Sequence, residues 1–163
     1  MTEAAVEILL VEDNPNDVEL TLHAFESNRL ANNVQVLRDG AEALHYLFRT
    51  GPYAGRPEES PKVILLDLKL PLVDGLEVLR NVKADPRLRA IPVVMLTSSR
   101  EERDIVESYQ LGVNSYIVKP VDFEQFTEAM RQIGLYWALL NEPPTGPGKP
   151  AGDWPPGPVR PVE

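Results

Sequence analysis

The sequence predicts an α/β protein built on a doubly wound, five-stranded parallel sheet with five helices. The first observation is a set of five short apolar runs, at residues 6–11, 34–37, 63–66, 93–96 and 115–118. Most of these runs lack strict in/out alternation, as expected for parallel strands that are covered on both faces. The second observation is that apolar residues return at helical spacing between and after the runs. Strands that alternate with helices indicate a parallel sheet with right-handed crossovers.

The helices can be placed by their apolar stripes and by the residues that begin them. The stripes are Val18, Leu22 and Phe25 in the first helix, Ala41, Leu44 and Phe48 in the second, and Phe126, Met130, Ile133, Trp137 and Leu140 in the last. Pro15 suits the first helical position, and it follows two good N-capping residues, Asp13 and Asn14. Ser99 followed by Glu102 predicts a capping box for the fourth helix.

Composition excludes several classes of protein. Of the 163 residues, 43% are hydrophobic, so one domain with a sizeable core is expected. The net charge of −9 argues against nucleic acid as a partner, because phosphate contacts need clustered Lys and Arg. The absence of cysteine excludes disulfides, thiolate metal sites and Cys nucleophiles, and two histidines are too few for a His-rich zinc site. The apolar runs are too short to span a bilayer, and residues 1–7 lack an apolar signal core, so we expect a cytoplasmic protein that does not enter membranes.

The chain divides in two near residue 140. Residues 141–163 contain eight prolines and four glycines, a composition that cannot build a core and is typical of an extended tail. We therefore expect a folded domain over residues 1–140 and a disordered Pro/Gly-rich tail over 141–163. Because a tail of this length is too short to fold as an effector domain, we expect no such domain within residues 141–163.

Chemically active residues follow four of the five apolar runs. Glu12 and Asp13 come after the first run, Asp67 after the third, Thr97 ends the fourth and Lys119 follows the fifth. The carboxyl ends of parallel strands share one sheet edge, which is where open α/β sheets bind ligands. Two carboxylates about 4 Å apart repel by about 4 kcal/mol at an effective dielectric of about 20, so such a group requires a counter-ion. A hard divalent cation such as Mg²⁺, with oxygen ligands and bound waters, meets that requirement.

With a metal present, Asp67 becomes the best nucleophile, because it ends an interior strand and is the central acid of the group. A carboxylate can attack phosphorus and form an aspartyl phosphate. The metal and Lys119 would neutralise the transferring oxygens, while the Thr97 hydroxyl could donate to one of them. Each residue also has a plainer explanation: Glu12 and Asp13 as helix caps, Thr97 as a turn residue and Lys119 as a solvated strand end. The joint pattern at one sheet edge favours a phosphoryl site.

As an ordered set, these residues resemble the receiver domain of two-component response regulators over residues 6–138. The matching stretches are Glu12-Asp13 after Ile-Leu-Leu-Val, Asp67 to Gly75, Thr97-Ser98 and Lys119-Pro120. The resemblance implies the flavodoxin-like strand order 2-1-3-4-5 and a phosphoacceptor signalling protein rather than an enzyme, with only self-catalysed transfer and slow autodephosphorylation. It further implies that Asp67 accepts a phosphoryl group from a histidine kinase.

The same resemblance assigns the neighbouring roles. Asp13, Asp67 and the backbone carbonyl of Lys69 would ligate Mg²⁺, with Glu12 acting through a metal-bound water. Thr97 and Lys119 would contact the phosphoryl oxygens, and the bond before Pro120 is expected to be cis. Tyr116 matches the aromatic switch position, although an ordinary strand aromatic would also suit that place.

Three rival functions compete with this assignment. The first is an aspartyl-phosphate hydrolase, which would place a second Asp two residues after the nucleophile, whereas position 69 is Lys. The second is a phosphate sink, and the third is an adaptor that keeps the fold without being switched.

Two further features narrow the resemblance. The long segment 50–61, with residues 85–92, 111–116 and 136–137, is similar to small single-domain regulators paired with bacterial phytochrome kinases, although related regulators serve other sensor kinases. Apolar and aromatic residues crowd the end of the last helix, and they are Leu135, Tyr136, Trp137, Leu139 and Leu140. We expect a homodimer through the face of the fourth helix, fifth strand and fifth helix that includes Tyr136, Trp137 or Leu139. The competing explanation is that these residues only hold the tail.

Overall fold

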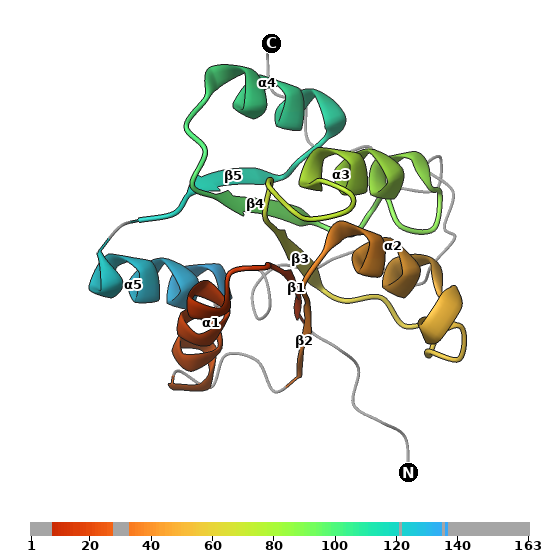
Figure 1. Ribbon diagram of the computed structural model, residues 1–163, viewed down its shortest axis with the longest axis horizontal. Helices are drawn as coiled ribbons and strands as arrows, with labels where there is room; N and C mark the ends of the chain where they lie inside the picture. Colours follow the sequence, from red (N-terminus) through yellow and green to blue (C-terminus); the bar gives the residue numbers. More distant parts are fainter. Residues whose placement is uncertain (1–7, 28–32, 121, 135, 137–163) are drawn as a thin grey trace.

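The computed structural model describes residues 8–27, 33–120, 122–134 and 136 (Figure 1). The strands are β1 (Ile8–Val11), β2 (Val34–Leu37), β3 (Val63–Leu66), β4 (Val93–Thr97) and β5 (Ser115–Val118). They form one sheet of five parallel strands in the order β2-β1-β3-β4-β5. The predicted strand positions and strand order are therefore confirmed, and Val6 and Glu7 of the first predicted run lie outside the described residues.

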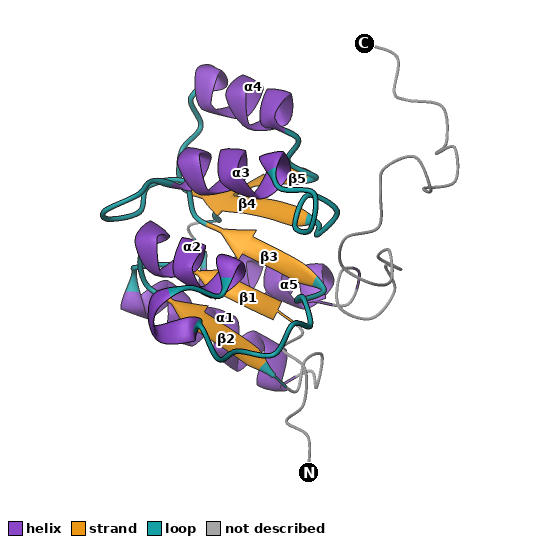
Figure 2. Ribbon diagram, turned by 90° about the vertical axis from the view of Figure 1, so that its right-hand side faces the viewer, coloured by secondary structure: helices purple, strands orange, loops and turns teal. Residues whose placement is uncertain are grey.

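Five α-helices connect and cover the strands. They are α1 (Pro15–Ser27), α2 (Gly40–Phe48), α3 (Gly75–Ala84), α4 (Glu102–Leu111) and α5 (Phe123–Ile133), with a 3₁₀ turn, η1 (Gly51–Tyr53), after α2. Helices α1 and α5 lie together on one face of the sheet, and α2 and α3 lie on the other (Figure 2). Pro15 begins α1 as predicted, and the Asn14 carboxamide oxygen caps it by accepting from the Asn16 and Asp17 amides.

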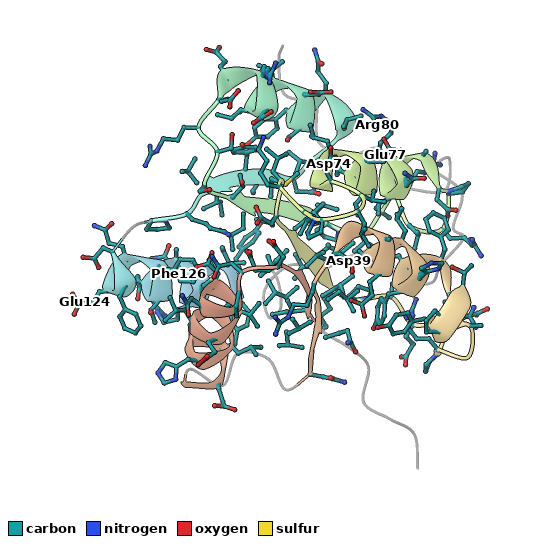
Figure 3. The ribbon with its side chains drawn as sticks, viewed as in Figure 1. Asp39, Asp74, Glu77, Arg80, Glu124 and Phe126 are labelled. Carbon is teal, nitrogen blue, oxygen red and sulfur yellow. The ribbon has the colours of Figure 1, made fainter. Side chains whose placement is uncertain are left out.

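The sheet separates two hydrophobic cores. Alternate residues of β1, such as Ile8 and Leu10, pack with α1 and α5, whereas Leu9 and Val11 pack with α2 and α3. Strands β1, β3 and β4 are buried along their whole length, which explains why their sequences show no polar alternation. At the edge where these strands end, Asp39 and Asp74 cap α2 and α3 by accepting from the amides of Glu42 and Glu77 (Figure 3).

Several local predictions differ from the structure. The most buried face of α2 carries Ala43, Tyr46 and Leu47, while the predicted stripe of Ala41, Leu44 and Phe48 is only partly buried. The apolar arc of this helix is wide, and the predicted stripe is one margin of it. The described part of α5 ends at Ile133, so Trp137 and Leu140 lie outside the described residues.

The predicted cis bond before Pro120 is wrong: all peptide bonds among the described residues are trans. The trans isomer is the lower in energy by about 0.5–1 kcal/mol for a bond to proline. Within the same residues, no helix is long and apolar enough to cross a membrane.

Candidate functional site

Three carboxylates meet where β1 and β3 end. Each of Glu12, Asp13 and Asp67 offers an oxygen that lies within 4.8 Å of the others. The parallel register that pairs Val11 with Leu66 brings the following residues together, and the Asp67 amide donates to the Val11 carbonyl at 3.0 Å. Glu12 and Asp67 are buried, while Asp13 is exposed. This donor set consists only of oxygens and is open to solvent on one side, so it fits a hard divalent cation such as Mg²⁺.

Lys119 reaches this cluster from the far edge of the sheet. Its backbone amide donates to the Thr97 carbonyl at 2.8 Å, which fixes the point where the chain leaves β5. The ammonium Nζ then lies 2.6 Å from Glu12 Oε1, 2.8 Å from Asp17 Oδ2 and 3.5 Å from Asp67 Oδ2. The structure therefore brings Glu12, Asp67 and Lys119 together as predicted. The carboxylate of Asp17 joins those of Glu12, Asp13 and Asp67 as a fourth.

The charges of this group perturb one another. Burial raises the pKa of Glu12 to about 7; the hydrogen bond from Lys119 opposes the shift, and the charge of Asp67 adds to it. Burial alone would lower the pKa of Lys119, but its hydrogen bonds to Asp17 and Glu12 and the charge of Asp67 outweigh burial and raise it. The ammonium therefore stays protonated at neutral pH and supplies a permanent positive charge beside Asp67.

The loop after Asp67 is tightly held. The Leu68 amide donates to Asp67 Oδ1 at 2.7 Å, and the Gly75 amide donates to the Leu68 carbonyl at 2.7 Å. A Cβ on Gly75 would lie 2.1 Å from the Asp67 carbonyl oxygen, so only glycine fits there. Lys69, whose carbonyl was predicted to bind metal, lies within this loop, and its side chain is exposed.

Thr97 is the last residue of β4, and Tyr116 is the second residue of β5. Thr97 is fully buried, and because β4 pairs with β3, its hydroxyl group lies at the same sheet edge as Asp67. The Thr97 Oγ1 accepts from the Ser99 amide at 3.3 Å. The partly buried Tyr116 packs against the core and donates from its hydroxyl to the Ser99 carbonyl at 3.1 Å. The loop after β4 thus links Thr97 to Tyr116.

The predicted capping box at α4 is wrong. The N-cap residue is Glu101, with no capping hydrogen bond from its side chain. Ser99 instead donates from Oγ to the buried carboxylate of Asp104 at 2.6 Å. The Ser99 hydroxyl therefore joins the loop before α4 to a side chain of α4 and does not cap the helix. Of the residues predicted at a dimer contact, Tyr136 is 52% exposed, whereas Trp137 and Leu139 lie outside the described residues.

Asp17 is the site residue that sequence reasoning missed. It lies in the first turn of α1, where an acidic residue is explained equally well by the helix dipole. The available signal was its position five residues after Glu12, in the first turn of the helix that follows the first strand.

Comparison with known proteins identifies the family. Residues 8–131 match the model of the response regulator receiver domain. The chain belongs to that family. Among curated relatives, it is 46% identical over 137 residues to the probable methanogenesis regulatory protein FilR2 of Methanothrix harundinacea, covering 84% of this chain and 86% of FilR2. It is 39% identical over 130 residues to the response regulator Rcp1 of Synechocystis, covering 80% of this chain and 87% of Rcp1.

Solved structures of receiver domains give the same result. The phosphorylated cyanobacterial phytochrome response regulator RcpA is 42% identical, with a TM-score of 0.81 over 87% of this chain and all of RcpA. The bacteriophytochrome response regulator AtBRR is 63% identical, with a TM-score of 0.67 over 86% of this chain and all of AtBRR. Rcp1 has been solved in a Mn²⁺-bound form, 37% identical, with a TM-score of 0.80 over 86% of this chain and 99% of Rcp1. The homologues of this receiver domain therefore include phytochrome and bacteriophytochrome response regulators.

Proposed function

We propose that this receiver domain is a single-domain response regulator that accepts a phosphoryl group on Asp67 from a sensor histidine kinase. The observation that carries the proposal is the convergence of the Lys119 ammonium and three carboxylates on the end of β3. Asp67 is buried and lies in contact with this group. A buried carboxylate without a positive partner would reduce the stability of the fold. Family membership supports the assignment, as does the phosphorylated state of RcpA.

In the proposed reaction, an Asp67 oxygen attacks phosphorus as the bond from phosphorus to the kinase histidine breaks. The electron pair of that bond leaves with the imidazole nitrogen. Glu12, Asp13, Asp67 and the Lys69 carbonyl would hold Mg²⁺, which supplies positive charge to the transferring oxygens. The ammonium of Lys119 neutralises those oxygens from the other side, and Thr97 donates a hydrogen bond to one of them.

The test is labelling by acetyl phosphate and Mg²⁺, read by intact-mass spectrometry. We expect phosphate on the wild type and none on Asp67→Asn, with Asp85→Asn as a matched control because Asp85 lies at the opposite end of α3 from Gly75. Equal labelling of wild type and Asp67→Asn would refute the assignment of the acceptor.

We also expect a chain truncated after residue 140 to label normally, since the proposed tail carries no site residue.

The proposed kinase is a bacteriophytochrome, and the 63% identity to AtBRR is the main support. Phosphotransfer rates from a panel of purified kinases test it: a bacteriophytochrome should transfer fastest. A faster transfer from an unrelated sensor kinase would reassign the pairing.

A cytoplasmic location follows from such a partnership, and separation of cytosol from membranes with a tag-specific antibody would check it.

The proposed dimer uses the face of α4, β5 and α5. Val106 and Tyr109 of α4 are 45% and 51% exposed, and Tyr136 beyond α5 is 52% exposed. Exposed apolar side chains are typical of a contact between copies of a chain. Light scattering should show a dimer that Tyr109→Glu dissociates, whereas Leu72→Glu, at an exposed apolar residue in the loop after β3, should not. A monomeric wild type at all concentrations would refute the dimer.

A further inference from the structure

Lys119 is bound more closely to Asp17 than to Asp67. The ammonium lies 2.8 Å from Asp17 Oδ2 and 3.5 Å from Asp67 Oδ2. The first distance is that of a strong charge-assisted hydrogen bond, and the second is at the limit of hydrogen bonding. The positive charge that phosphoryl transfer requires is therefore held on the α1 side of the site.

The structure fixes Asp17 where it can hold the ammonium. Its backbone amide donates to Asn14 Oδ1 at 3.2 Å, and its carbonyl accepts from the buried Thr21 hydroxyl at 2.7 Å. Both backbone groups of Asp17 are thus engaged within the first turns of α1. The backbone of Asp17 is therefore fixed, and only its short side chain has to be ordered for contact with Lys119.

The two nearest carboxylates differ in how readily they release the ammonium. Glu12 accepts from Lys119 through Oε1 and from the Asn14 amide through Oε2, and its side chain is only 3% exposed. Asp17 is 22% exposed, so water can take over its lost hydrogen bond. Breaking the contact of Lys119 with Asp17 therefore costs less than breaking its contact with Glu12.

We propose that Asp17 is a positioning residue that keeps the Lys119 ammonium at the limit of hydrogen-bonding distance from Asp67 and releases it toward Asp67 when a phosphoryl group arrives. This inference rests on the proposed function of the same site. A phosphoryl group on Asp67 brings more negative charge than the carboxylate it replaces, so it competes with Asp17 for the ammonium. Asp17 thereby stabilises the unphosphorylated protein and limits both the rate and the extent of phosphorylation.

The experiment uses the full chain and two probes. With acetyl phosphate, the Asp67 oxygen forms a bond to phosphorus, the bond from phosphorus to the acetate oxygen breaks, and acetate leaves with the electron pair, while Lys119 keeps its protons. The second probe is beryllofluoride with Mg²⁺, which mimics a phosphoryl group and reports affinity without group transfer; ¹⁹F NMR measures it. Circular dichroism confirms that each variant is folded.

We expect Asp17→Asn, which keeps the shape and removes the charge, to label about three- to tenfold faster and to bind beryllofluoride more tightly by a similar factor. Asp17→Glu keeps the charge and should stay close to wild type. Glu19→Gln removes the same charge from an exposed position two residues later on α1, so it measures the general effect of lowering the net charge.

Two results would overturn the inference. Asp17→Asn that matches Glu19→Gln with both probes would show that Asp17 has only a diffuse electrostatic effect. Slower labelling or weaker beryllofluoride binding would show that Asp17 assists transfer or only supports the fold. Either result is distinct from failure of the proposed function itself, in which the wild type would take no phosphate or Asp67→Asn would label as well as wild type.

Discussion

Neutralising Asp67 should change stability with opposite sign in the absence and presence of Mg²⁺. An oxygen of Asp67 lies within 4.8 Å of one from Glu12 and one from Asp13. At that limiting distance and an effective dielectric of about 20, each such pair costs about 3.5 kcal/mol, and the attraction of Lys119 at 3.5 Å offsets about 4.7 kcal/mol. Because Asp13 is exposed and screened, Asp67→Asn should raise the free energy of unfolding of the metal-free protein by about 1–2 kcal/mol.

Urea denaturation near pH 8 is the assay, because Glu12, with a pKa of about 7, is then mostly ionised. In EDTA the variant should be the more stable protein. At saturating Mg²⁺ the wild type should overtake it, since the metal neutralises three carboxylates in the wild type and loses one ligand in the variant. Glu19→Gln should show no such reversal. Equal stability of wild type and Asp67→Asn in EDTA would refute the argument that these charges repel one another.

Three further predictions concern the backbone and the titrating groups. Gly75→Ala should cost about 3 kcal/mol or more of unfolding free energy and reduce labelling, because its Cβ would lie 2.1 Å from the Asp67 carbonyl oxygen; urea denaturation measures the first effect and acetyl phosphate the second. Burial lowers the pKa of Lys83 from 10.5 to about 8, so the unfolded state binds more protons in that window. Stability should rise with pH there, by at most about 1.4 kcal/mol per unit, relative to Lys83→Met, and parallel curves for the two proteins would contradict this. The pKa of Glu12 near 7 means that the carboxylate forms as pH rises, so Mg²⁺ affinity measured by titration should increase between about pH 6 and 8 in wild type and stay flat in Glu12→Gln.

The fold could be predicted because its strands are short and uniformly apolar. Runs such as residues 63–66 contain no polar residue, and burial on both faces is the simplest explanation of such a run. The site followed from topology, since the residue after each run had to reach one edge. Predictions that depended on a single local pattern were less accurate. Ser99 and Glu102 have the spacing of a capping box, but the Ser99 hydroxyl donates to the carboxylate of Asp104, and the capping pattern does not include that residue.

Asp17 could not be predicted for a related reason. Its ion pair with Lys119 joins residues 102 positions apart in the sequence, one in the first turn of α1 and the other directly after β5. Sequence spacing gives helical faces and strand ends, but it does not give the side-chain reach of a lysine across two neighbouring strands. The partners of long polar side chains at a shared sheet edge therefore cannot be predicted from sequence spacing and become visible only in the structure.

The acceptor loop and the residues facing it differ in how far they can adjust. Leu72 has φ of +69°, a strained value for leucine, in a tight turn where the Val73 amide donates to the Pro71 carbonyl at 2.7 Å. The start of α2 holds this turn: the Gly40 amide donates to Pro71, and a Cβ on Gly40 would lie 1.7 Å from the Val73 oxygen. These backbone contacts restrain the loop on one side of Asp67, so it adjusts less readily to an added anion. On the opposite side of the site, Lys119 can exchange its contact with the partly exposed Asp17 side chain, and we expect the accommodation to come from there.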